Sequence, residues 1–115
     1  MAIEVIIRGS RGATVVDFHG RLDMHSRWHV KAIINQCCHT EREHLILNLQ
    51  NLIFVDSAGL GFLVLFSRKF QDLHRRITWI QPQGCVGDLI ESLQLHDLIS
   101  ICRTEQEALS SSSSL

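Results

Sequence analysis

Asp56 and Ser57 are the adjacent residues of this sequence whose types and position point most directly to chemistry. Both residue types favour the N-terminus of a helix, and the pair stands directly before a long apolar segment. The first turn of a helix has free backbone N–H groups and a partial positive charge, and both favour an anion such as phosphate. We therefore expect Ser57 to lie where a helix begins, and its hydroxyl is a candidate acceptor for a phosphoryl group.

Small residues follow this serine at Ala58, Gly59 and Gly61. They would let the active site of another protein approach the backbone closely, although each glycine within a helix costs roughly 0.5–1 kcal/mol relative to alanine. On these residues alone a purely structural interpretation stays open. In it, Asp56 or Ser57 only caps the helix, and the glycines only allow tight packing on a sheet.

A serine hydrolase would use a similar arrangement, because its nucleophile also follows a strand and opens a helix. The chain has seven histidines. However, the residues around Ser57 lack the first glycine of Gly-x-Ser-x-Gly, and Asp56 stands directly beside the serine, which is not the order of a catalytic triad. We therefore predict no catalytic residue and no enzyme activity.

Two groups of residues have side chains that could bind a metal ion. His25 and His29 are four residues apart and could share a helix face, and Cys37, Cys38 and His39 are consecutive. Neither group provides a complete set of ligands at a known spacing. The sequence also lacks the glycine-rich motifs Gly-x-x-x-x-Gly-Lys-Ser/Thr and Gly-x-Gly-x-x-Gly. We predict no metal and no cofactor.

The strand that must position Ser57 lies just before it. Residues 45–49 form a short, almost continuously apolar run, which is typical of a strand buried on both faces in the middle of a sheet. Gln50 and Asn51 predict a break after it. Residues 60–66 are apolar over more of the helix circumference than one core face needs, which predicts either an exposed patch beside Ser57 or a second packed face.

The other elements are predicted from the same apolar periodicities. Residues 3–8 and 13–19 should pair as an antiparallel hairpin, with Ile3, Val5 and Ile7 pointing inward. After a turn over residues 20–23, a helix of about residues 26–39 has an expected apolar face made by Trp28, Val30, Ile33, Ile34, Cys37 and Cys38. The remaining elements are a strand over 77–80, a helix over 86–95, a strand over 98–102 and a last short helix opened by a capping box at Thr104 and Glu107.

Strands that alternate with helices after an initial hairpin predict an α/β fold. We expect one domain over residues 1–109, with a mixed, mostly parallel sheet of about five strands, about four helices and right-handed crossovers. Ser57 then falls at the carboxyl end of a central strand, where α/β sheets tend to place their binding sites. Residues 110–115 contain five serines that cannot bury surface, and we expect a disordered tail or an expression remnant.

Composition excludes several classes of partner. The 115 residues carry a net charge of −1, which offers no electrostatic footprint for nucleic acid or for an anionic membrane. No apolar run has the roughly 18–20 residues of a membrane span, and the N-terminus lacks the features of a secretory signal. We expect no direct membrane insertion and a cytoplasmic protein, whose four cysteines, without Cys-x-x-Cys spacing, are expected to be buried thiols.

The run from Phe54 to Gly61, Phe-Val-Asp-Ser-Ala-Gly-Leu-Gly, follows a hydrophobic strand and precedes Leu63-Val64-Leu65. This block resembles the signature of the STAS family, the bacterial anti-sigma factor antagonists. The run from Val15 to Asp23 is similar to the second strand of that family and its Gly-x-Leu-Asp turn. The order of elements is similar through Ala108, so the resemblance covers nearly the whole chain.

The resemblance implies a switch that is controlled by serine phosphorylation. In the family, the unphosphorylated domain binds an anti-sigma factor, a serine kinase of the histidine-kinase-like ATPase type, and so releases a sigma factor. The kinase phosphorylates the serine that matches Ser57, which breaks the binding, and a serine phosphatase restores it. The implied partner-binding residues are Asp23, Asp56, Ser57, Ala58, Gly59, Leu60 and Gly61.

Two positions depart from the family pattern, and a second role stays open. Asn48 and Arg21 stand where the family often has acidic residues, which would alter the choice of partner. Asp23 is equally well explained as an ordinary turn residue at the entry to a helix. STAS-like domains also serve as scaffold or accessory subunits of stress-signalling or lipid-transport complexes, in which the serine need not be phosphorylated.

Overall fold

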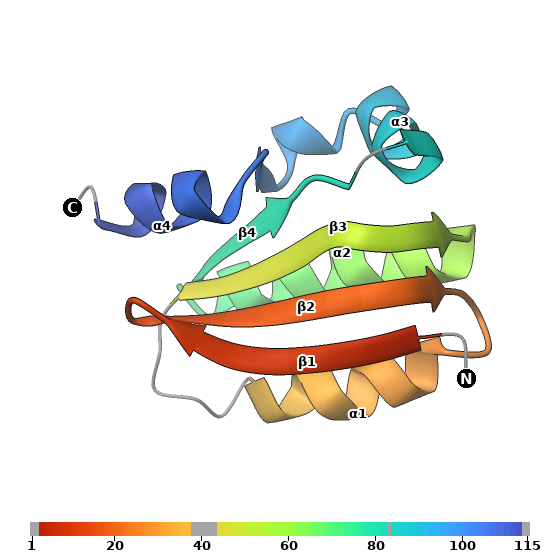
Figure 1. The fold of residues 1–115 in the computed structure, drawn as a ribbon, viewed down its shortest axis with the longest axis horizontal. Coiled ribbons are helices and arrows are strands. Elements are labelled where there is room, and N and C mark those ends of the chain that lie inside the picture. The colour runs from red at the N-terminus through yellow and green to blue at the C-terminus, as the bar shows by residue number, and fades with distance from the viewer. Residues whose placement is uncertain (1–2, 38–43, 83, 114–115) are drawn as a thin grey trace.

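The computed structural model describes residues 3–37, 44–82 and 84–113, which build one five-stranded sheet with helices on both faces (Figure 1). The strands stand in the sheet in the order in which they occur in the chain: β1 (Ile3–Ser10), β2 (Ala13–Leu22), β3 (His44–Val55), β4 (Arg76–Ile80) and β5 (Ser100–Cys102). This arrangement confirms the predicted α/β fold with a mixed sheet.

The first two strands form the predicted hairpin. β1 and β2 pair antiparallel, with Ile3 opposite Gly20 and Ser10 opposite Ala13. From β2 onward all pairs are parallel. Figure 1 shows β2 and β3 pointing in the same direction, so their carboxyl ends meet at one end of the sheet.

Three helices cover one face of the sheet. α1 (Arg27–Cys37), α2 (Ser57–Asp72) and α3 (Gly84–Ser92) contribute to one large apolar cluster with the inward side chains of the strands. Leu45, Leu47 and Leu49 belong to this cluster, whereas Ile46 points to the opposite face. The run 45–49 is therefore buried on both faces, as its composition predicts.

The last helix, α4 (Glu105–Ser113), covers part of the other face, where Ala108 and Leu109 pack on strand residues. The Thr104 hydroxyl accepts a hydrogen bond from the Glu107 N–H at 3.1 Å, which confirms the predicted cap. Arg8 donates to Asp17 and to Glu105, so an ion pair fastens α4 to the first strand.

Several boundaries differ from the prediction because strand pairing overrides local sequence. β3 runs through Gln50 and Asn51 to Val55, and β2 continues through the expected turn to Leu22. Pairing of His19 with Asn51 and of Leu22 with Val55 keeps both strands extended past the register shifts. α4 continues through Ser113, where disorder was expected from Ser110 onward. After α3 a short 3-10 helix, η1 (Leu95–Asp97), precedes β5.

Some side chains also face differently from the prediction. Ile3 is buried as expected, but Ile7 is 41% exposed on the edge strand β1. Cys85 is exposed and Cys102 is half-buried, so the expectation of buried thiols is wrong for both. The side chain of Cys37 and all of Cys38 lie outside the described residues.

Candidate functional site

Ser57 is the first residue of α2, and Asp56 is its N-cap. Asp56 has extended backbone angles, and its carboxylate oxygen Oδ1 accepts a hydrogen bond from the Gly59 N–H at 2.7 Å. The Asp56 carbonyl accepts the first helical hydrogen bond, from the Leu60 N–H at 2.9 Å. The predicted start of the helix at Ser57 is thus confirmed, and Asp56 has a defined structural role.

The same aspartate also holds the loop that follows β2. Its second carboxylate oxygen, Oδ2, accepts a hydrogen bond from the Met24 N–H at 3.0 Å, and its own N–H donates to the Leu22 carbonyl at 3.2 Å. One side chain therefore connects the first turn of α2 to the entry of α1. This places the loop with Asp23 at the Ser57 end of the sheet.

Asp23 organises that loop into the turn that opens α1. Its Oδ1 accepts hydrogen bonds from the Ser26 N–H and the His25 N–H, each at 3.0 Å. These bonds, that from Ser26 above all, favour the ionised carboxylate and hold the pKa of Asp23 below its usual range. The geometry explains Asp23 as a turn residue, and its contact with a partner stays a prediction.

Ser57 is exposed, and it begins a ridge on the outer side of α2. Ser57, Gly61 and Leu65 are four residues apart and lie one above the other along the helix. A hollow lies on each side of this ridge, the first toward α1 and the second toward α3. All three residues line both hollows. Leu65 is 73% exposed, so of the two alternatives left open by the sequence an exposed apolar patch beside Ser57 is present.

The hollow between α1 and α2, here called the α1 groove, has a volume of about 310 Å³. Its lining residues are Arg27, Trp28, Lys31, Ser57, Ala58, Gly61, Phe62 and Leu65. Trp28 is 61% exposed, which corrects the prediction that it belongs to the apolar face of this helix. Val30 and Ile34 form that face, while Trp28 turns outward between two cations.

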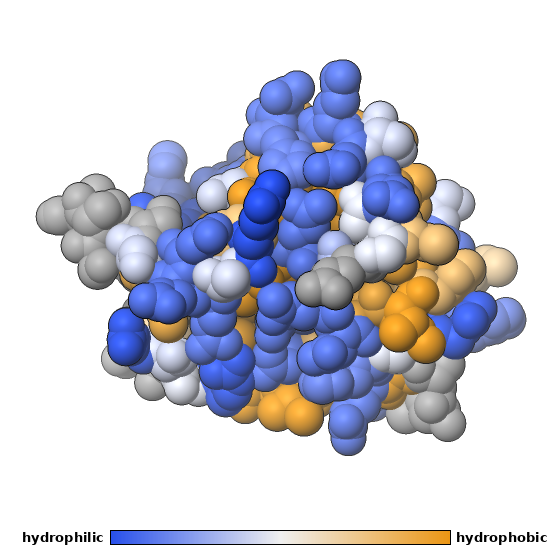
Figure 2. Space-filling model, turned by 45° about the horizontal axis from the view of Figure 1, so that its top comes forward, coloured by the Kyte–Doolittle hydropathy of each residue, from blue (hydrophilic) through white to orange (hydrophobic). Residues whose placement is uncertain are grey.

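The hollow between α2 and α3, here called the α3 groove, is larger, at about 650 Å³, and more apolar. Besides the ridge it is lined by Leu60, Val64, Leu89, Leu93 and Leu95. In Figure 2 hydrophobic residues gather at the right-hand end of the molecule, the end to which β2 and β3 point in Figure 1. Most of the remaining surface in that view is hydrophilic.

The two glycines that follow Ser57 have different surroundings. A Cβ added to Gly59 would lie 2.6 Å from the Leu22 carbonyl oxygen and 2.9 Å from the Leu22 Cγ, so only glycine lets α2 approach β2 this closely. A Cβ added to Gly61 would meet no described atom within 4 Å beyond its own neighbourhood in the helix. Packing therefore explains Gly59 and leaves Gly61 open toward solvent.

The alternative chemistries gain no support from the described residues. The lining residues of the two grooves include no histidine that could act as a base for Ser57. Within residues 3–37, 44–82 and 84–113, no three His, Cys, Asp or Glu side chains come together as a metal site. Cys38 and His39 of one suggested ligand group lie outside these ranges.

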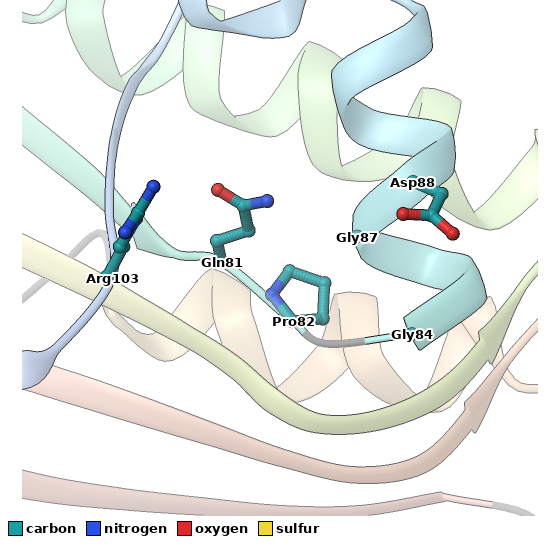
Figure 3. A pocket seen from close by; sticks show the side chains of 6 residues that line it. All are labelled: Gln81, Pro82, Gly84, Gly87, Asp88 and Arg103. Carbon is teal, nitrogen blue, oxygen red and sulfur yellow. The ribbon is translucent and has the colours of Figure 1, made fainter.

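A separate polar hollow of about 280 Å³ shares no lining residue with the grooves at Ser57 (Figure 3). Its lining residues are Gln81, Pro82, Gly84, Gly87, Asp88 and Arg103. In Figure 3, Arg103 and Gln81 lie on one side of it, and Asp88 lies on α3 at the other. None of the residues singled out from the sequence as a site residue lies there.

The STAS domain family model matches residues 4–108, which include part or all of every strand, the Ser57 ridge and both grooves. The chain belongs to the STAS domain family. In the part of this STAS domain that the structure describes, no helix combines the length and the apolar composition needed to cross a membrane.

Known relatives of this STAS domain include antagonists of anti-sigma factors. An anti-sigma F factor antagonist from Paenibacillus polymyxa is 32% identical over 65 residues, which are 56% of this chain and 56% of the relative. The match thus spans little more than half the length of that curated relative.

Solved structures show that the fold is shared along the chain. An anti-sigma factor antagonist from Mycobacterium paratuberculosis has a TM-score of 0.82 at 18% identity, with 96% of this chain and 93% of that chain covered. SpoIIAA of Bacillus, an anti-sigma factor antagonist in its unphosphorylated form, has a TM-score of 0.73 at 22% identity, with 99% and 100% covered. At these identities the likeness shows a common fold.

Asn48 and Arg21, the two residues that depart from the family pattern, each contact a residue of the neighbouring strand in this STAS domain. Asn48 is buried, donates to Asp17 at 2.7 Å and accepts a hydrogen bond from the Gln50 N–H at 3.1 Å. Arg21 lies over the ring of Phe54, 4.2 Å from its centroid. The contacts of Asn48 with Asp17 and of Arg21 with Phe54 could not be predicted from the sequence, because each joins residues of different strands.

Proposed function

We propose that this STAS domain is an anti-sigma factor antagonist whose binding to its partner is broken by phosphorylation of Ser57. The observation that carries the proposal is the position of the exposed Ser57 hydroxyl, at the N-terminus of α2 and at the point where two largely apolar grooves meet. The partner is an anti-sigma factor that is also a serine kinase of the histidine-kinase-like ATPase type. Its capture in the cytoplasm releases a sigma factor.

The surface around Ser57 has the character of a protein-binding site. Leu65 and Trp28 are both more than half exposed and stand on either side of the α1 groove. Exposed apolar residues that gather in one patch mark interaction sites, and tryptophan and arginine are enriched where binding energy is concentrated. Gly61 leaves room for the backbone of a partner to come close to the helix.

In the phosphorylation step the kinase transfers the γ-phosphoryl group of ATP to the Ser57 hydroxyl. The bond between Ser57 Oγ and the γ-phosphorus forms, the bond from that phosphorus to the oxygen of the leaving ADP breaks, and the hydroxyl proton passes to a base of the kinase. A serine phosphatase reverses the modification with water. The antagonist supplies the hydroxyl and the surface, so its own role is not that of an enzyme.

The phosphate changes this surface without unfolding the domain. It adds a charge of roughly −1.5 to −2 beside Asp56. The Asp56 carboxylate cannot turn away, because both of its oxygens accept backbone hydrogen bonds that hold the helix and the preceding loop. The N-terminus of α2 tolerates the added negative charge, so the cost falls on partner binding.

The test is a pull-down from lysate of the native host with four proteins: wild type, Ser57→Ala, Ser57→Asp and the control Ser100→Asp. Ser100 is an exposed serine of β5 that lines neither groove. We expect every protein except Ser57→Asp to retain a kinase-like ATP-binding protein. After incubation with ATP and lysate, mass spectrometry should find phosphate on Ser57 of the wild type.

Retention of the same scaffold or membrane-transport proteins by wild type and Ser57→Asp would overturn the proposal. The domain would then be an accessory subunit in which Ser57 is not a switch.

A further inference from the structure

The α1 groove contains two positive charges that no lining residue neutralises. Arg27 and Lys31 lie one turn apart on α1, and both line the groove together with Ser57. The lining residues include no carboxylate, and neither cation forms an ion pair with another described residue. The groove is therefore suited to an anion.

Both cations are positioned by the same aromatic ring. The Arg27 guanidinium carbon lies 5.0 Å from the Trp28 ring centroid, and the Lys31 ammonium nitrogen lies 5.1 Å from it. Such contacts orient a cation but leave its N–H groups available for hydrogen bonds. Arg27 Nε is buried and has no hydrogen-bond partner among the described residues, so this donor is unused.

Phosphorylation of Ser57 would place an anion in this groove from the α2 side. The Ser57 hydroxyl forms no hydrogen bond with another described residue, and it faces the groove from the first turn of the helix. A phosphate on this hydroxyl would have Asp56 as a fixed negative neighbour on one side. The positive charges of Arg27 and Lys31, which line the same groove, can compensate this negative charge.

We propose that Arg27 and Lys31 bind the phosphate of phosphorylated Ser57 within the same chain. The inference rests on the proposed phosphorylation of Ser57 and adds a second effect to it. Besides introducing negative charge, the modification withdraws both cations and part of the α1 groove from the surface offered to a partner. The phosphorylated domain then presents a closed groove in place of an open, positively charged one.

The test uses protein with phosphoserine installed at position 57 during translation, so that no kinase is needed. The second pKa of the phosphate, about 6 in an unperturbed phosphoserine, is followed by ³¹P NMR at low ionic strength. A nearby cation favours the dianion and lowers this pKa. We expect Lys31→Met and Arg27→Met each to raise the phosphate pKa by about 0.5, and the double variant to raise it further.

The matched control is Lys69→Met. Lys69 is an exposed cation in the last turn of α2, about 18 Å along the helix from Ser57. Lys69→Met should leave the phosphate pKa unchanged. Arg27→Lys keeps the positive charge, so its phosphate pKa should stay close to that of wild type. Asp56 and the helix N-terminus are the same in all variants, so the differences isolate the two cations.

An unchanged phosphate pKa in Lys31→Met and Arg27→Met would overturn the inference. Lys31 is exposed, so its variant should fold even if Arg27→Met does not, and far-UV circular dichroism checks both. The titration is independent of the lysate experiments. It can fail while Ser57 is still phosphorylated by the host, and it can succeed while the host leaves Ser57 unmodified.

Discussion

The two sides of α2 use the same residue types for opposite purposes. Ser67, on the inner side, is fully buried; its hydroxyl donates to the Leu63 carbonyl at 2.8 Å and accepts from the Trp79 indole N–H at 2.9 Å. Ser57, on the outer side, is exposed and has no such partner among the described residues. One serine completes the core, and the other is available to another molecule.

The glycines repeat this difference within a single turn. Gly59 faces β2, where the Leu22 carbonyl leaves no space for a side chain, whereas Gly61 faces open space between the two grooves. A glycine within a helix is costly whichever way it faces. The fold accounts for this cost at Gly59, whereas at Gly61 no packing contact with another described element accounts for it.

The largest expected effect is at the inner glycine. Gly59→Ala should lower the free energy of unfolding by about 3 kcal/mol, because the added methyl group meets a backbone carbonyl that can yield only by moving β2. Urea unfolding followed by circular dichroism measures the change. A loss below about 0.5 kcal/mol would show that α2 can shift outward freely and would break the comparison.

A somewhat smaller loss is expected at the inner serine. Ser67→Ala should cost about 2 kcal/mol, because the indole N–H of Trp79, buried completely, loses its acceptor. Ser57→Ala is the matched control and should change stability little, since its hydroxyl is exposed. Equal effects of the two substitutions in urea unfolding would contradict the distinction between the sides.

At the outer glycine, Gly61, substitution by alanine is expected to stabilise the protein instead of destabilising it. Gly61→Ala should raise the free energy of unfolding by about 0.5–1 kcal/mol, because alanine has the higher helix propensity and meets no steric contact here. In the pull-down the same variant should retain less of the partner than wild type. A variant that is both more stable and fully competent in binding would leave Gly61 without a functional reason.

The smallest effect concerns the loop that Asp56 ties to the outer side. The pKa of Asp23 is lower in the folded chain, chiefly through its hydrogen bond from the Ser26 N–H, so these bonds stabilise the fold above the unfolded pKa of about 3.9. That stabilisation is lost as the pH falls through the lower folded pKa. Asp23→Asn should therefore lose less stability than wild type between neutral pH and about pH 3, as measured by urea midpoints. Parallel curves for the two proteins would show that Asp23 titrates as it does in the unfolded chain.

The sequence predicts those features that local signals determine. The apolar run 45–49 predicted the central strand, because burial on two faces requires consecutive apolar residues. The pair Asp56-Ser57 predicted the start of α2, because capping requires particular residue types at that position. The hairpin and the capping box at Thr104 were found for the same reason.

Features that depend on distant residues could not be predicted. β3 continues through Asn51 because Asn51 pairs with His19 of β2. No residue close to Asn51 in the sequence indicates this pairing. Trp28 fits an apolar helix face by its residue type, but its place beside Arg27 and Lys31 turns it to the surface. Ser67 likewise looks like an ordinary helix residue until Trp79 is placed against it. The grooves are invisible in the sequence because each needs two helices.

The strand order has a consequence for how this chain folds. Each strand pairs with the strand that precedes it, so no strand has to be inserted between two that are already paired. The hairpin of β1 and β2 can form first, and every later strand then adds to a growing edge after its connecting helix has been made. Each step then closes only the one connection between two successive strands, which limits its loop-closure entropy. The sheet can therefore assemble in the order in which the ribosome synthesises it.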